Sequence, residues 1–237
     1  MKDKKSRILI YVLSASCAVL LCTVIIMTAV LRRNTATGSE AVSSHAEQQD
    51  PGTPGPQRIL FIGDSRTIDM FADSDDEISG LDSGDGITVS AKHGGKFAYM
   101  TEAVARYGVD KFDVLVTCMG ANDDGDFQNY EIYYDGLLSQ GKKLIVCTVG
   151  PTNDEDLFVD NIPRYLNKNM VSFNGSLTAW AEKNDIEVID VYGFINDSQS
   201  IKIDPDDGIH YLPRPTSELW DFIAENINQR VTGDGSV

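Results

Sequence analysis

Residues 58–67 read RILFIGDSRT, and this stretch decides the class of fold that the sequence predicts. Four apolar residues at 59–62 run into Gly-Asp-Ser, after which the sequence turns polar. A short, continuous apolar run is typical of a strand that is covered on both faces, as in a parallel sheet. The strand could end at Ser65 for no chemical reason, or it could hold the Ser65 hydroxyl in the open. These ten residues alone do not decide between the two.

Further apolar runs of this kind recur along the chain, separated by segments with the spacing of helices. They are GITVSA (86–91), FDVLVTCMG (112–120), KLIVCTVG (143–150) and IEVIDVYG (186–193). Strands that alternate with helices predict an α/β fold, a three-layer α/β/α sandwich around a roughly five-stranded parallel sheet. In such a sheet, ligands bind at the carboxyl ends of the strands.

Two segments carry the apolar spacing of an amphipathic helix. Residues 161–184 place apolar side chains at three- and four-residue steps, with Pro163 where a first-turn proline belongs. Residues 216–227 repeat this spacing behind a Thr-Ser pair that can cap a helix. Trp180 and Trp220 lie inside these patterns, so we expect both to be core residues.

The N-terminal region predicts a membrane anchor followed by a tether. Residues 8–31 contain no charge across 24 positions, which is long enough for a transmembrane helix. Basic residues dominate residues 1–7, so this short segment is expected to be cytoplasmic and the chain beyond the span extracytoplasmic. Residues 32–57 are small, polar and rich in Pro and Gly, which is typical of a flexible linker. The folded domain is expected to comprise residues 58–237.

Two other interpretations of the N-terminal region stay open. A cleaved signal peptide normally has a shorter apolar region that ends in small residues, whereas this one ends in Arg32 and Arg33. Lipid modification at Cys17 or Cys22 is a further alternative, although apolar sequence continues past both cysteines.

Charge and cysteine content exclude several classes of protein. The formal net charge is −16, and residues 34–237 hold 14 basic against 35 acidic residues, a net charge of −21. Such a domain repels nucleic acid and anionic lipid. Cys118 and Cys147 lie in apolar strand patterns and are expected to be buried free thiols, with a disulfide between neighbouring strands as the alternative. We expect no metal and no cofactor.

Polar residues gather after the predicted strands, at the ends where a parallel sheet binds ligands. Ser65 follows the first strand, and Asn122 follows the third. Asp207 and His210 form an Asp-x-x-His just before the last helix. His93 and the glycine pair Gly94-Gly95 follow the second strand.

These residue types are the parts that acyl transfer through a serine needs. Ser65 can be the nucleophile and His210 its base, with Asp207 orienting the imidazole. His93 has no carboxylate at such a spacing, so it is the weaker candidate for the base. The Asn122 amide can donate to an oxyanion, together with the backbone N–H groups of Ser65 and of Gly94 or Gly95.

Four sequence blocks contain these residues: Gly63-Asp64-Ser65, His93-Gly94-Gly95, Gly120-Ala121-Asn122-Asp123 and Asp207-Gly208-Ile209-His210. Taken together, the four blocks resemble the SGNH (GDSL-type) hydrolases across about residues 58–230. The resemblance implies a flavodoxin-like fold, a Ser65-His210-Asp207 triad and an oxyanion hole of Ser65, Asn122 and Gly95, the last preferred to Gly94. One departure from the family pattern is that Arg66 stands where the family usually has Leu.

Three further residues, Asp64, Arg66 and His93, lie beside the predicted site in the sequence. They are the expected substrate contacts. Alternatively, Arg66 is a surface cation that pairs with Asp69.

The resemblance and the predicted anchor together suggest a membrane-anchored extracytoplasmic serine esterase. Its expected substrate is a small acyl ester, in particular an acetyl ester on a cell-surface carbohydrate. Two alternatives stay open: an O-acetyltransferase that uses the same acyl-serine intermediate, and a non-catalytic glycan-binding module on the same fold. The oligomeric state is not predicted.

Overall fold

The computed structural model describes residues 57–71, 76–84 and 86–232. The predicted cytoplasmic segment 1–7, the predicted anchor 8–31 and nearly all of the predicted linker 32–57 lie outside these residues. Within the described ranges, no helix is both long and apolar enough to cross a bilayer. The chain divides into two units, Met1–Thr53 and Pro54–Val237, and only the second is described below.

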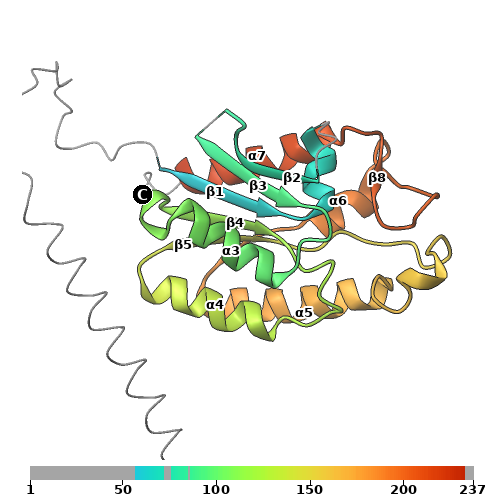
Figure 1. Ribbon diagram of the computed structural model, residues 1–237, viewed down its shortest axis with the longest axis horizontal. Helices are drawn as coiled ribbons and strands as arrows, with labels where there is room; N and C mark the ends of the chain where they lie inside the picture. Colours follow the sequence, from blue (N-terminus) through green and yellow to red (C-terminus); the bar gives the residue numbers. More distant parts are fainter. Residues whose placement is uncertain (1–56, 72–75, 85, 233–237) are drawn as a thin grey trace, which may run out of the picture. The chain divides into compact units, whose positions relative to one another are not determined.

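A six-stranded sheet forms the middle of the domain, in the order β2-β3-β1-β4-β5-β6 (Figure 1). Five of these strands run parallel, which confirms the predicted α/β fold with a mostly parallel sheet. They are β1 (Ile59–Gly63), β3 (Ile87–Lys92), β4 (Val114–Cys118), β5 (Lys143–Cys147) and β6 (Glu187–Ile189). The sixth strand, β2 (Glu77–Asp82), pairs antiparallel with β3 at one edge and was not predicted. Its last four residues are exposed, so it lacks the apolar run that marks the others.

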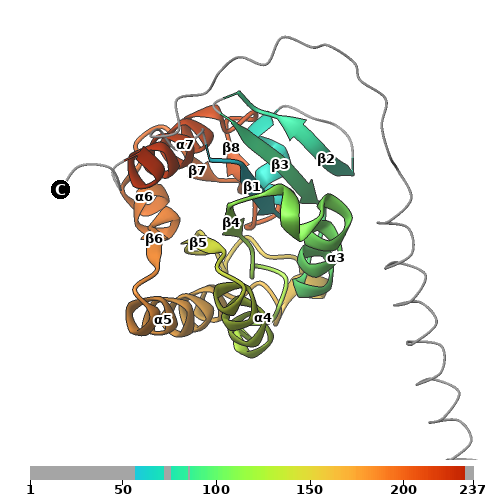
Figure 2. The ribbon, with the colours of Figure 1, turned by 90° about the vertical axis from the view of Figure 1, so that its left-hand side faces the viewer.

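The continuous apolar runs are explained by the two hydrophobic cores, one on each face of the sheet. Leu60 and Ile62 of β1 enter one core, while Ile59 and Phe61 enter the other. Each of these side chains is at most 3% exposed, and burial of one such side chain contributes roughly 1.5–3 kcal/mol. Helices α3 (Phe97–Tyr107), α4 (Gln128–Ser139) and α5 (Asn167–Asn184) cover the first face, and α6 (Val191–Asp197) and α7 (Ser217–Thr232) cover the second (Figure 2).

The predicted helix over residues 161–184 begins later than expected, at Asn167. Pro163 therefore does not occupy its first turn, and a 3-10 turn, η3 (Val159–Asn161), comes before it. The Asp154 carboxylate accepts a hydrogen bond from the Asn167 N–H at 2.6 Å, so the helix start is capped by a residue from the preceding loop. Residues 162–166 belong to this loop, which passes close to the candidate site.

The C-terminal helix and the tryptophans agree more closely with the sequence. Helix α7 starts at Ser217, and the Thr216 carbonyl accepts from the Leu219 N–H at 3.1 Å. Trp180 is buried, as predicted. Trp220 is half-buried and packs edge-on against Phe61, with ring centroids 5.3 Å apart.

Cys118 and Cys147 end the neighbouring strands β4 and β5. Both are free thiols, as predicted, but only Cys147 is fully buried, whereas Cys118 is half-buried. A hydrogen bond with Cys118, together with burial, raises the pKa of Cys147.

A separate two-stranded hairpin, β7 (Lys202–Ile203) and β8 (Tyr211–Leu212), stands beyond the carboxyl ends of the main strands (Figure 1). It is not hydrogen-bonded into the main sheet. The loop between its strands carries the Asp-x-x-His sequence. Two-residue strands are too short to show an alternating pattern, so the hairpin could not be expected from the sequence.

Candidate active site

Ser65 is the first residue of a one-turn helix, α2 (Ser65–Ile68), that starts as soon as β1 ends. The Asp64 carboxylate caps this turn and accepts from the Arg66 N–H at 3.0 Å. Gly63 makes the sharp turn possible, because a Cβ there would collide with the Thr67 side chain. The strand thus delivers Ser65 to the carboxyl edge of the sheet, where the side chain is 8% exposed.

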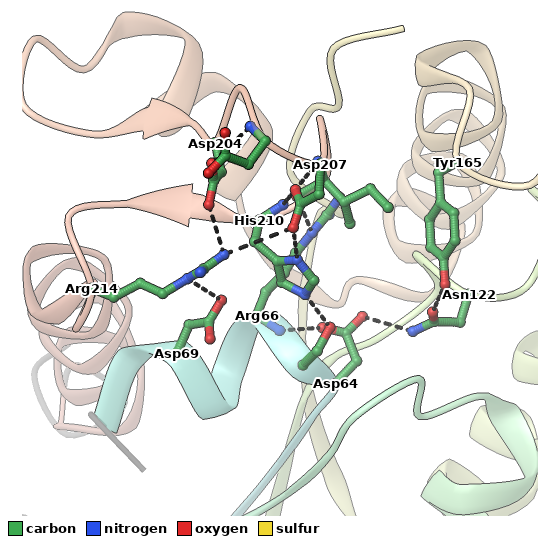
Figure 3. A network of polar contacts seen from close by, with 12 residues as sticks. Asp64, Arg66, Asp69, Asn122, Tyr165, Asp204, Asp207, His210 and Arg214 are labelled. Carbon is green, nitrogen blue, oxygen red and sulfur yellow. Dashed lines mark hydrogen bonds and ion pairs between the residues drawn. The ribbon is translucent and has the colours of Figure 1, made fainter. Parts of the chain in front are cut away.

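Ser65, His210 and Asp207 form a continuous hydrogen-bonded chain, of which Figure 3 labels His210 and Asp207. The Ser65 Oγ lies 2.9 Å from the His210 Nε2, and the His210 Nδ1 lies 2.7 Å from the Asp207 Oδ2. The other Asp207 oxygen accepts from the backbone N–H groups of Ile209 at 2.7 Å and His210 at 2.9 Å. This is the geometry that lets a base take a serine proton while an acid holds the ring.

The electrostatics of Asp207 suit an ionised partner for the imidazole. Partial burial works to raise the pKa of Asp207. Hydrogen bonds from the His210 backbone, the His210 ring and the Ile209 backbone outweigh it and bring the pKa below its usual value. The carboxylate is therefore charged at neutral pH.

The loop that carries Asp207 and His210 is closed by backbone hydrogen bonds. The Asp204 N–H donates to the His210 carbonyl at 2.8 Å, and the Gly208 N–H donates to the Asp204 carbonyl at 2.8 Å. Gly208 has φ +70°, and a Cβ there would meet the Asn153 carbonyl oxygen at 2.6 Å. The Asn153 N–H in turn donates to the Gly208 carbonyl at 2.9 Å, which joins the triad loop to the loop after β5.

The Asn122 side-chain amide is held by hydrogen bonds to three neighbours, Asp64, Gly95 and Tyr165. Figure 3 labels Asn122 between Asp64 and Tyr165. Its Nδ2 donates to the Gly95 carbonyl at 2.9 Å and, at 3.4 Å, to the Asp64 Oδ2. Tyr165 donates its hydroxyl to the Asn122 Oδ1 at 2.7 Å. Because the Gly95 carbonyl can only accept, the amide nitrogen must face it, and the Tyr165 hydroxyl then donates to the amide oxygen.

Gly95 differs from its expected role. Its backbone N–H donates to the Lys92 carbonyl at 2.9 Å, so the hydrogen is already engaged within the turn after β3. The space around it is tight, since a Cβ would meet the Lys92 carbonyl oxygen at 3.0 Å and the Tyr99 ring at 3.2 Å. Gly94 has φ +63° and open surroundings. Gly95 therefore approaches the site through its carbonyl, which accepts from Asn122.

The three expected substrate contacts are placed differently from one another. Asp64 is only 3% exposed and caps α2, and burial raises its pKa, although the nearby charge of Arg66 counters this. Arg66 is 5% exposed and donates to the carbonyls of Gly150 and Ile209, so it is neither a surface cation nor paired with Asp69. The alternative that Arg66 is a surface cation paired with Asp69 is therefore wrong, because the single turn of α2 is buried. His93 is exposed on the loop after β3.

Two residues of the site were missed by sequence reasoning. Tyr165 comes from the loop before α5, although the sequence predicts a helix there. Arg214 follows β8 and lies between three carboxylates, those of Asp69, Asp204 and Asp207 (Figure 3). A lone arginine in a Pro-Arg-Pro sequence carries no signal of this kind.

A small cavity of about 10 Å³ is lined in part by Asp64, Arg66 and Tyr211. This volume suits about one water molecule. Neither this cavity nor four others of 390 to 490 Å³ in the described domain is lined by Ser65, Asn122 or His210.

Comparisons with known proteins place the fold. The chain matches no family model and no curated protein. Among solved structures, a GDSL-like lipase from Bacteroides thetaiotaomicron aligns over 76% of this chain and 89% of its own, with 16% identity and a TM-score of 0.57. A lipase/acylhydrolase from Enterococcus faecalis aligns over 73% of this chain and 97% of its own, with 15% identity and a TM-score of 0.55. The described domain therefore has the α/β fold of these acyl hydrolases.

Proposed function

We propose that the domain is a serine hydrolase of the SGNH (GDSL) type that cleaves small acyl esters through an acyl-serine intermediate. One observation carries the proposal, the continuous chain from Ser65 Oγ through His210 to Asp207, with contacts of 2.9 and 2.7 Å. The resemblance of the four sequence blocks to this family and the shared fold support it.

In the first half of the reaction, His210 takes the Ser65 proton as the Oγ attacks the ester carbonyl. The carbonyl becomes a tetrahedral oxyanion, and His210 then gives its proton to the departing alcohol. In the second half, His210 takes a proton from a water that attacks the acyl-serine. As the tetrahedral intermediate collapses, His210 returns that proton to the Ser65 Oγ and the carboxylic acid leaves. Asp207 stays ionised and holds the imidazole in both halves.

Charge on the oxyanion needs donors that are already in place. The Ser65 N–H, at the start of α2, has no partner within its own helix because of its position. The Asn122 Nδ2 is the side-chain donor, and the oxyanion would replace its long 3.4 Å contact with Asp64. The Gly95 N–H joins them only if the turn releases its bond to Lys92.

The substrate that we propose is an acetyl or similarly small ester on a cell-surface carbohydrate. The predicted anchor and linker at residues 8–57 would hold the domain at the outer face of the membrane, where such carbohydrates lie. The acidic surface charge keeps it off anionic lipid.

The test is a panel of aryl esters of increasing acyl length and of acetylated glycans, assayed with wild type and Ser65→Ala. We expect acetate to be released, the rate to fall as the acyl chain lengthens, and Ser65→Ala to be inactive. Glycan binding without hydrolysis would indicate a binding module instead. Acetyl transfer to an added sugar that outpaces hydrolysis would indicate a transferase.

A further inference from the structure

Arg66 is a buried cation next to the proposed nucleophile, and its contacts call for a role. The side chain is 5% exposed, although a buried charge costs free energy unless it is well bonded. Its Nε donates to the Ile209 carbonyl at 3.1 Å, and its Nη1 donates to the Gly150 carbonyl at 3.0 Å. The guanidinium also lies over the Tyr211 ring, 5.2 Å from its centroid.

These contacts join the two halves of the triad. Ser65 directly precedes Arg66, and His210 directly follows Ile209, whose carbonyl Arg66 binds. The main sheet does not hold the two halves together, because Ser65 follows β1 whereas His210 lies in the separate β7–β8 hairpin. Their 2.9 Å contact therefore depends on side-chain and loop contacts.

Tyr211 binds the same loop after β5 as Arg66 does. Its hydroxyl donates to the Pro151 carbonyl at 2.9 Å, next to the Gly150 carbonyl that Arg66 binds. Arg66 and Tyr211 thus connect the loop that carries His210 to the loop after β5. The planar guanidinium is needed because it presents two N–H groups to two carbonyls at once, which a lysine cannot do in the same geometry.

We propose that Arg66 is a positioning residue that sets the distance between Ser65 Oγ and His210 Nε2 by holding the Ile209 carbonyl. The proposal rests on the proposed function, since it assigns Arg66 a part in activating the same serine. It also replaces the expectation that Arg66 contacts the substrate.

The kinetic test compares Arg66→Met and Arg66→Lys with wild type on an aryl acetate, using the full-length protein in detergent. A misplacement of about 1 Å can cost about 10²-fold in rate, so we expect kcat to fall by about that factor in Arg66→Met and KM to stay within about twofold. Arg66→Lys keeps the charge and one donor, so a smaller loss of about tenfold is expected. The matched control is Arg58→Met, because Arg58 makes three side-chain hydrogen bonds at the other end of β1. It should leave kcat unchanged.

A second measurement does not depend on turnover. The chain has only three histidines, so labelling histidine with ¹⁵N gives three imidazoles to resolve. In wild type, Ser65→Ala should shift the His210 Nε2 resonance, because it removes the hydroxyl at 2.9 Å. In the Arg66→Lys background the same substitution should produce a clearly smaller shift, since the contact is weakened there. If wild type hydrolyses no ester, the proposed function fails, and this measurement still decides the role of Arg66.

The proposal is overturned by any of three results. The first is a folded Arg66→Met with wild-type kcat. The second is a rise in KM at constant kcat, which would make Arg66 a substrate contact. The third is a full Ser65-dependent Nε2 shift in Arg66→Lys. If Arg66→Met does not fold, as its loss of a thermal unfolding transition would show, Arg66→Lys and the resonance measurement give the answer.

Discussion

Arg214 supports the triad from the solvent side, and its removal should change the pH dependence of activity. Its Nε lies 3.2 Å from the Asp69 Oδ2, and its Nη2 lies 3.1 Å from the Asp204 Oδ2 (Figure 3). The Nη2 also lies 3.8 Å from the Asp207 Oδ2, the oxygen that accepts from the His210 Nδ1. A positive charge is thus held close to the ring that must stay neutral to act as a base.

The size of the effect follows from Coulomb's law. Because both distances are measured to one oxygen, the Arg214 Nη2 and the His210 Nδ1 are at most about 6.5 Å apart. At that separation two unit charges repel by about 0.6 kcal/mol even at the dielectric constant of bulk water. About 0.6 kcal/mol corresponds to a factor of about three in an equilibrium constant. A lower effective dielectric constant makes this factor larger.

The perturbation is Arg214→Gln, and the measurement is kcat/KM on an aryl acetate against pH at low ionic strength. Without the guanidinium, a positive charge on the imidazole is less opposed, so we expect the acid limb of the profile to move to higher pH. Arg214→Lys should restore most of the wild-type profile, and high salt should shrink the difference.

Arg106→Gln is the matched control, because Arg106 of α3 makes an ion pair at the surface with Glu77 of β2. It should leave the acid limb in place. An acid limb that stays put in Arg214→Gln, or moves to lower pH, would refute the reasoning.

Three further predictions concern the amide donor, its partner and acid stability. Asn122→Ala should lower kcat by about 10²–10³ while the domain stays folded, measured with an aryl acetate and by thermal unfolding. Tyr165→Phe removes the hydrogen bond that orients the Asn122 amide and should lower kcat by about fivefold, the equivalent of one ordinary hydrogen bond. Hydrogen bonds from Arg58 lower the pKa of Asp113 to about 2, so its stabilising effect is present above pH 4 and is lost toward pH 2. Asp113→Asn should therefore reduce the free energy of unfolding at pH 6 by less than about 1 kcal/mol, because the pair is exposed, and the difference should shrink in urea titrations at lower pH.

Each of these has a contrary outcome. Full activity in Asn122→Ala would remove the amide from the proposed oxyanion hole. A Tyr165→Phe effect that persists unchanged when Asn122 is already alanine would mean that Tyr165 does not act through that amide. A constant stability difference between Asp113→Asn and wild type from pH 6 to pH 3 would contradict the linkage.

Apolar runs and the residues that follow them were enough to predict the parallel sheet and the residues that meet at its edge. The reason is physical: a strand buried on both faces needs consecutive apolar side chains, as residues 59–62 of β1 show. Parallel strands then bring their carboxyl ends to one edge, so Ser65 and Asn122 come close although they are far apart in sequence. The edge strand β2 has mostly exposed residues and gave no such signal.

The errors all arise where long-range contacts override a local pattern. Pro163 matched a helix start, but the Asp154 carboxylate caps the helix at Asn167 instead. Arg66 was expected to contact the substrate or, alternatively, to be a surface cation, and only the carbonyls of distant loops explain its burial. Tyr165 could not be connected with Asn122 until the loop before α5 was placed.

The most direct test of the central claim is covalent labelling of the serine. A fluorophosphonate added to the full-length protein should form one adduct, and mass spectrometry of the digested protein should place it on Ser65. Ser65→Ala should show no adduct, and His210→Ala should label far more slowly because the base is gone. No adduct on folded wild type, or an adduct on a serine other than Ser65, would contradict the account.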